Sequence, residues 1–188
     1  TIPAVSKIYY KSSVNKTVEG FDAVHVVDNL GQLELWIGET KFYDDVDRAI
    51  RDVSDEIVAH LQTDYLRNEF ILIKNKIDTA WPHSQELSKL LDSNVSLDQV
   101  FERACIPVLL TYDSSVVGSS KSGDSNYLTD IKKEFEKSWK KMRARLSEKY
   151  EEMFGEALPI AVHVILIPLE TKLEFLAALH GRLKARQT

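Results

Sequence analysis

The stretch Gln32-Leu-Glu-Leu-Trp-Ile-Gly-Glu-Thr-Lys-Phe42 alternates apolar and polar residues and decides the fold. Successive side chains of a strand point to opposite faces, so this stretch predicts a strand with one buried face. Phe21–Asp28 alternates in the same way, and Asn29-Leu-Gly31 supplies a turn between the two segments. Together they predict an antiparallel hairpin.

Two further apolar segments extend the predicted sheet. Pro107–Tyr112 and Pro159–Pro168 are short apolar runs that predict buried central strands. Val46–Leu61 carries apolar residues at helical spacing behind two good N-caps, Asp44 and Asp45. This order of elements predicts a mixed sheet of the α/β (α+β) class with helices on both faces. The remaining predictions are a strand at Lys7–Tyr10, helices at Leu66–Ile77, Ser84–Leu91, Ser96–Ala104, Leu128–Tyr150 and Thr171–Ala185, and a mobile surface loop at residues 113–125, which are rich in Ser.

Length and composition predict one domain over residues 1–188. Of the 188 residues, 44% are hydrophobic and 28% are charged. The longest apolar run, Ile160–Leu169, is too short to cross a membrane, and no secretion signal opens the chain. The single Cys105 cannot form an internal disulfide, which favours a packing thiol and a reducing, cytoplasmic setting. Because the sequence begins with Thr1 and not Met, we expect an N-terminal segment to be missing from it.

The net charge of −5 hides two stretches of opposite sign. Residues 18–62 contain eleven acidic and three basic residues, whereas residues 132–149 contain eight basic and three acidic ones. The acidic stretch can hold cations and the basic stretch polyanions, although solvated helix faces give the same pattern. The candidate contacts to a phosphate backbone or to a partner protein are Lys133, Lys137, Lys140, Lys141 and Arg143.

A candidate reactive site lies at the end of the strand quoted above. Glu39 and Lys41 continue its apolar odd positions, so the carboxylate and the ammonium emerge on one face. If Asp28 pairs with Leu33, Asp22 lies opposite Glu39, with the two Cβ atoms roughly 5 Å apart. A slip of one residue would separate them, and the turn sequence permits this register without requiring it. A surface ion pair of Glu39 and Lys41 is the alternative interpretation.

The residue types Asp22, Glu39 and Lys41 suit the hydrolysis of a phosphodiester bond. Two neighbouring carboxylates repel each other unless a cation lies between them. Mg²⁺ is bound by one or two carboxylates and completes its octahedron with water and phosphate oxygens. A neighbouring Lys can orient the attacking water and offset charge in the transition state. The triplet alone is weak evidence, because Glu170-Thr171-Lys172 repeats it; we assign that copy to helix capping and solvent.

Other polar and aromatic residues receive no chemical role from the sequence. Tyr43 shares the face of Lys41 and can approach a substrate, but an aromatic residue at the edge of a core needs no function. Trp36, on the opposite face, is expected in the core. The histidines lack the spacing of a zinc site. They are His25, His60, His83, His163 and His180.

Asp22 and Glu39-x-Lys41 on adjacent strands resemble the PD-(D/E)xK nuclease superfamily. The runs Gly20–Val26, Glu34–Tyr43 and His163–Leu169 more narrowly resemble HamA, the nuclease subunit of the bacterial Hachiman anti-phage defence system. This resemblance implies a restriction-endonuclease-like fold and a deoxyribonuclease that works with a helicase subunit. It assigns catalysis to Asp22, Glu39 and Lys41, and the binding of Mg²⁺ or Mn²⁺ to the two acids. Such nucleases usually place a helix, often with a further acid, before the first strand, which this sequence does not supply.

The sequence therefore leaves three hypotheses open. The leading one is a metal-dependent DNA nuclease, with the basic helix assisting contact to DNA or to a partner. The second is a non-catalytic module that keeps the fold and binds nucleic acid or protein through its charged surfaces. The third is a nuclease half-site that stays silent until a missing segment or a helicase completes it.

Overall fold

The computed structural model describes residues 21–29, 31–120 and 124–186, which form a mixed sheet with seven helices. Its four strands lie in the order β1-β2-β3-β4; β1 and β2 are antiparallel, and the other neighbours are parallel. The predicted α/β class is thus confirmed, whereas the strand predicted at Lys7–Tyr10 falls outside the described residues. The strands are β1 (Ala23–Asn29), β2 (Gln32–Phe42), β3 (Ala104–Asp113) and β4 (Ala161–Leu169).

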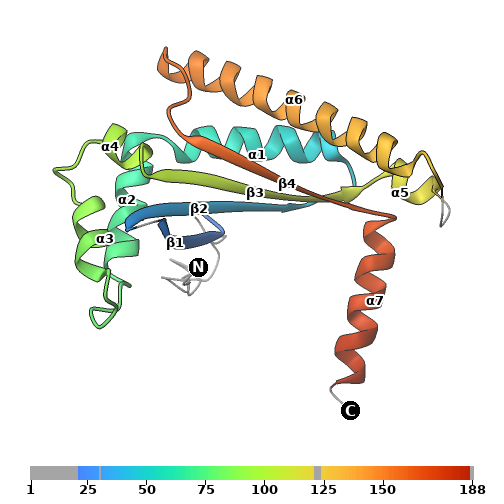
Figure 1. The fold of residues 1–188 in the computed structure, drawn as a ribbon, viewed down its shortest axis with the longest axis horizontal. Coiled ribbons are helices and arrows are strands. Elements are labelled where there is room, and N and C mark those ends of the chain that lie inside the picture. Colours follow the sequence, from blue (N-terminus) through green and yellow to red (C-terminus); the bar gives the residue numbers. More distant parts are fainter. Residues whose placement is uncertain (1–20, 30, 121–123, 187–188) are drawn as a thin grey trace, which may run out of the picture.

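The helices surround the sheet unevenly. In Figure 1, α1 and α6 run along one face, α2, α3 and α4 gather beyond one end of the strands, and α7 projects from the end of β4. None of the described helices is both long enough and apolar enough to cross a membrane. The helices are α1 (Val46–His60), α2 (Thr63–Lys74), α3 (Ser84–Leu90), α4 (Leu97–Phe101), α5 (Ser115–Ser119), α6 (Tyr127–Phe154) and α7 (Lys172–Ala185).

The β1–β2 hairpin has the register that the sequence analysis used. Asp28 pairs with Leu33, and the strand pairing continues to Ala23 and Gly38. Gly31 has a φ of 87°, a left-handed conformation that glycine adopts without steric cost. The hairpin therefore places one complete alternating face of β2 toward the core.

The core lies on that face of the sheet and contains buried residues of α1, α2, α3, α4 and α6. Leu35 and Ile37 of β2 pack with Val53 and Ile57 of α1, and all four side chains are buried. Burial of such side chains stabilises the fold by about 1.5–3 kcal/mol each. The Asp45 side chain caps the start of α1 by accepting a hydrogen bond from the Arg48 backbone N–H, at 2.6 Å. Strand β2 and helix α1 thus form one packed unit.

Strand β4 differs from its prediction as a buried central strand. It is the last strand of the described sheet, and alternate residues on its second face are open, with Ile165 50% and Ile167 42% exposed. An apolar run alone cannot distinguish a fully buried strand from one buried on a single face. On the second face of the described sheet, α7 makes an aromatic contact through Phe175, whose ring lies 5.7 Å from that of Phe42.

The predicted loop at residues 113–125 also needs correction. Strand β3 continues to Asp113, and α5 occupies Ser115–Ser119. The Ser114 side chain caps this short helix by accepting a hydrogen bond from the Val117 backbone N–H. A serine can favour a loop or begin a helix, which is why composition alone predicted only a loop here. Residues 121–123 lie outside the described part of the chain.

Candidate active site

Strand β2, together with the residue that follows it, and helix α1 present polar residues to each other in three matched pairs. Residues two apart in a strand rise about 6.6 Å on one face, and residues four apart in a helix rise about 6 Å on one face. Because α1 runs back along β2, the two spacings stay in step. The pairs, called here the β2–α1 ladder, are Glu39 with His60, Lys41 with Glu56, and Tyr43 with Asp52.

Glu39 is the buried end of the ladder. Its side chain is only 2% exposed, and its Oε1 lies 2.8 Å from His60 Nδ1. A carboxylate can only accept, so the ring nitrogen is the donor. The His60 ring stacks on Tyr65 at 4.4 Å and meets the edge of Phe21 at 4.9 Å. Glu39 is therefore held in place by a ring that is itself packed between two aromatic side chains.

Lys41 is the cationic group of the site. Its ammonium pairs with Glu56 of α1, and its side chain is 15% exposed. Burial by itself would lower the pKa of Lys41, but the hydrogen bond and charge of Glu56, with the charges of Glu39 and Asp22, outweigh it and raise that pKa. Lys41 is therefore protonated at neutral pH. It can donate hydrogen bonds and offset negative charge, but it cannot accept a proton.

Tyr43 and Asp52 form the outer pair of the ladder. The Tyr43 hydroxyl donates to Asp52 Oδ2 at 3.0 Å, and the Arg48 guanidinium lies 5.4 Å from the centre of the Tyr43 ring. Burial, together with the nearby Asp52 carboxylate, raises the pKa of Tyr43. The hydroxyl is thus a hydrogen-bond donor at neutral pH, and the sequence suggestion that Tyr43 lies on the face of Lys41 fits this arrangement.

Asp22 lies just before Ala23, the first residue of β1, which pairs with Gly38 of β2. Its Oδ2 accepts hydrogen bonds from both the backbone N–H and the hydroxyl of Thr40, each at 2.8 Å. Its negative charge, with that of Glu39, acts on Lys41. The carboxylate is therefore fixed beside the residue that separates Glu39 from Lys41. Its sharing of one metal ion with Glu39 stays a prediction.

The donor set is compatible with Mg²⁺ held mainly by water and two carboxylates. In the described structure, Asp22 accepts hydrogen bonds through Oδ2 and Glu39 accepts one through Oε1. Mg²⁺ is commonly bound through one or two carboxylates and several waters. Within the described residues, no group of three or more His, Cys, Asp or Glu side chains is arranged to hold a metal ion. The residues therefore offer two carboxylates, of the type that Mg²⁺ prefers, and the described chain holds no closed cage of protein ligands.

The basic residues of α6 do not form one free surface. Lys141 forms an ion pair with Asp47 of α1 at 2.8 Å. Asp55 of α1 forms ion pairs with both Arg145 and Lys149, each at 2.9 Å. The acidic and basic stretches of the sequence thus partly neutralise each other where α1 and α6 pack. The other candidate DNA or partner contacts, Lys133, Lys137, Lys140 and Arg143, are exposed, and Lys133 and Lys140 form ion pairs within α6 with Asp130 and Glu136.

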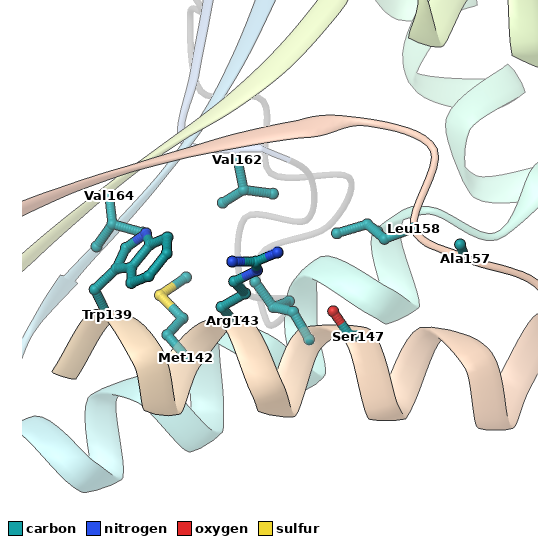
Figure 2. A pocket seen from close by; sticks show the side chains of 9 residues that line it. Trp139, Met142, Arg143, Ser147, Ala157, Leu158, Val162 and Val164 are labelled. Carbon is teal, nitrogen blue, oxygen red and sulfur yellow. The ribbon is translucent and has the colours of Figure 1, made fainter. Parts of the chain in front are cut away.

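Arg143 lines a groove between α6 and β4. This groove has a volume of about 340 Å³. Figure 2 shows Arg143 and Trp139 rising from α6 beside Val162 and Val164 of β4. The Arg143 guanidinium lies 5.4 Å from the centre of the Trp139 ring, a cation–π geometry. Arg143 therefore has a local packing role in addition to its exposure.

Sequence reasoning missed the α1 side of the ladder. Asp52, Glu56 and His60 recur every fourth residue, so the sequence places them on one stripe of α1. That stripe is the available signal in the sequence, and it lies beside the apolar stripe that predicts the helix. The sequence gives His60 no chemical role, whereas the structure places its ring against Glu39.

The second Glu-Thr-Lys triplet has the capping role that the sequence analysis assigned, with one difference. The Thr171 side chain caps α7 by accepting from the Glu174 backbone N–H at 3.2 Å. Lys172, which was assigned to solvent, instead donates from Nζ to the Phe42 carbonyl at 2.8 Å and lies 4.7 Å from the centre of the Phe42 ring.

Comparison with known proteins identifies a family. A family model described as HamA matches residues 1–183, a range that contains every residue of the site described above. No curated protein and no solved structure matches the chain significantly. The roles of individual residues are therefore argued from the geometry of this chain.

Proposed function

The chain belongs to the HamA family of anti-phage defence proteins, and from this premise we propose that it is a metal-dependent nuclease that hydrolyses phosphodiester bonds of DNA. The observation that carries the proposal is the buried Glu39 carboxylate two residues from the protonated Lys41, with the charge of Asp22 acting on the same ammonium. A buried charge is costly unless a partner or a function retains it. Glu39 and Lys41 lie near the end of β2, and Asp22 lies just before β1.

Each residue has a distinct part in the proposed reaction. Asp22 and Glu39 would hold Mg²⁺ or Mn²⁺, which supplies Lewis-acid activation of the phosphodiester and of a bound water. Lys41 keeps its proton, so it donates hydrogen bonds that orient the attacking water and offset charge on the phosphate. Thr40 holds the Asp22 carboxylate through its backbone N–H and its hydroxyl.

The decisive experiment measures DNA cleavage by the wild-type protein and by Glu39→Gln. The amide keeps the volume of Glu39 and a hydrogen-bond acceptor for His60, but it removes the charge. We expect cleavage in Mg²⁺, loss of cleavage in EDTA, and a rate for Glu39→Gln that is lower by about 10²–10³-fold. Glu170→Gln is the matched control, because Glu170 is the exposed first residue of the other triplet. A folded Glu39→Gln protein that cuts DNA normally would overturn the proposal.

One observation favours a non-catalytic binding module as the second candidate. Each of the three site residues already has a protein partner: Thr40 for Asp22, His60 for Glu39 and Glu56 for Lys41. A module that only binds DNA or protein has no reason to take up a metal ion there. Titration with Mg²⁺ or Mn²⁺ separates the two candidates, because only the nuclease loses ion binding when Asp22 is replaced by Asn.

We also propose DNA and a helicase subunit as the partners. The exposed Lys133, Lys137 and Lys140 support a contact to DNA phosphates, and such contacts weaken as salt rises. The apolar side chains exposed on α7, among them Leu173 and Leu183, support a contact to another protein. Co-purification with the helicase subunit is expected for the wild-type chain and is expected to fall for Leu183→Asp.

A further inference from the structure

We propose that His60 is a positioning residue of the site, which orients the Glu39 carboxylate for metal binding through the hydrogen bond from its Nδ1. The inference rests on the proposed function, since it assigns a part in that same site. It concerns an α1 residue that has no contact with substrate in this proposal and that acts through Glu39 alone.

The first step of the argument is the isolation of Glu39. At 2% exposure its carboxylate has almost no access to bulk water, so the protein must supply its hydrogen bonds. Among the described residues, His60 supplies one to Oε1 at 2.8 Å. With Oε1 engaged, rotation of the carboxylate is restricted and Oε2 is the oxygen left for an ion. A bond of this kind to a metal-binding carboxylate typically changes metal affinity by about 10–100-fold.

The second step is the fixation of His60 itself. Its ring stacks on Tyr65 with an angle of 10° between the planes, and it meets Phe21 edge-on at 67°. A ring held by one stacked and one edge-on aromatic contact cannot turn without losing one of them. The direction of the Nδ1 donor is therefore set by packing, and it is transmitted to Glu39.

The third step is the position of His60 on the ladder. It is the last residue of α1, and Glu56 one turn earlier pairs with Lys41. Helix α1 thus contacts both the Glu39 carboxylate and the Lys41 ammonium. The four-residue spacing of its contacts matches the two-residue spacing of Glu39 and Lys41 on the strand. A role limited to balancing a buried charge would not need the ring to be clamped on two sides.

The test separates the hydrogen bond from the packing of the ring by two complementary variants. His60→Phe keeps an aromatic ring against Tyr65 and Phe21 but removes the donor. His60→Asn places an amide nitrogen near the position of Nδ1 but removes the ring. Calorimetric titration with Mn²⁺ measures the affinity of each full-length variant, thermal unfolding measures its stability, and DNA cleavage is measured in parallel. His83→Asn, a half-buried histidine outside the site, is the control.

We expect His60→Phe to bind Mn²⁺ about 10–100-fold more weakly than the wild type and His60→Asn to stay within about threefold of it, whatever their stabilities. The opposite order, with the Phe variant normal and the Asn variant impaired, would overturn the inference, because the ring and not the bond would then matter. Wild-type affinity in both variants would overturn it as well. If His60→Phe does not fold, a weakened affinity in folded His60→Asn is sufficient to reject it.

Failure of the proposed function gives a different result. In that case the wild-type chain itself shows no Mn²⁺ binding that depends on Glu39, and Glu39→Gln titrates like the wild type. If Glu39→Gln loses the ion while both His60 variants retain it, the nuclease proposal stands and the positioning role of His60 is rejected.

Discussion

The triplet Glu-Thr-Lys occurs at residues 39–41 and again at residues 170–172, and the two copies lie in different environments. In the first, Glu39 is buried against His60, and Lys41 pairs with Glu56. In the second, Glu170 is exposed, and Thr171 caps α7. The comparison teaches that residue type and spacing can suggest a site. Burial and an opposing helix decide whether the residues are arranged to take part in a reaction.

The two lysines are the strongest way to test this difference. Lys41→Met removes the ammonium beside Glu39, and we expect the rate of DNA cleavage to fall by about 10²–10³-fold, because charge on the phosphate is no longer offset. Lys172→Met removes the bond to the Phe42 carbonyl and is expected to leave the rate within about twofold. Rates are measured on the same DNA in Mg²⁺. Equal losses in both variants would show that the two copies do not differ in function.

The two threonines sharpen the comparison, because their stability effects should match while their functional effects differ. Thr40→Val removes one hydrogen bond to Asp22, and Thr171→Val removes the cap of α7. Each change is expected to lower the free energy of unfolding by about 1 kcal/mol in a urea titration. Only Thr40→Val is expected to weaken Mn²⁺ binding, since only Thr40 holds a carboxylate of the site. Weaker binding in Thr171→Val would contradict the separation.

The smallest expected effect is the pH dependence of stability. The pKa of Lys41 is raised above its ordinary value of 10.5, so its pairing stabilises the fold fully below pH 10.5 and the contribution is lost as pH rises through the higher folded-state value. We expect the wild type to lose about 0.5 kcal/mol more than Lys41→Met across this range. Lys172→Met retains the Lys41 pair and should follow the wild type. Unfolding in denaturant at several alkaline pH values measures the slopes.

Much of the fold could be predicted because local rules determine it. Strand β2 has the predicted bounds Gln32–Phe42, and the hairpin has the register that the proposed chemistry needs, which the turn sequence permits without requiring. The long amphipathic helix α6 was also predicted from its apolar spacing. The position of β4 at the end of the sheet could not be predicted. An apolar run such as Pro159–Pro168 does not show whether one or both faces of the strand are covered by other elements.

The candidate site was predicted only on the strand side. Glu39 and Lys41 could be chosen because a period of two places them on one face with the apolar residues before them. Their partners Glu56 and His60 lie on a helix whose rotation about its axis depends on packing, and a single sequence does not give that rotation. The pairing of Lys141 with Asp47 was missed for the same reason, since it depends on which faces of α1 and α6 meet.

The ladder is made of contacts that are close in sequence. Its pairs, the bonds from Thr40 to Asp22 and the aromatic contacts of His60 all fall between Phe21 and Tyr65. Closing short loops costs little chain entropy, and local contacts form quickly. During synthesis from the N-terminus, the segment that carries these groups leaves the ribosome before α6 and β4 exist. Early folding steps can therefore assemble the reactive groups before the rest of the chain is made.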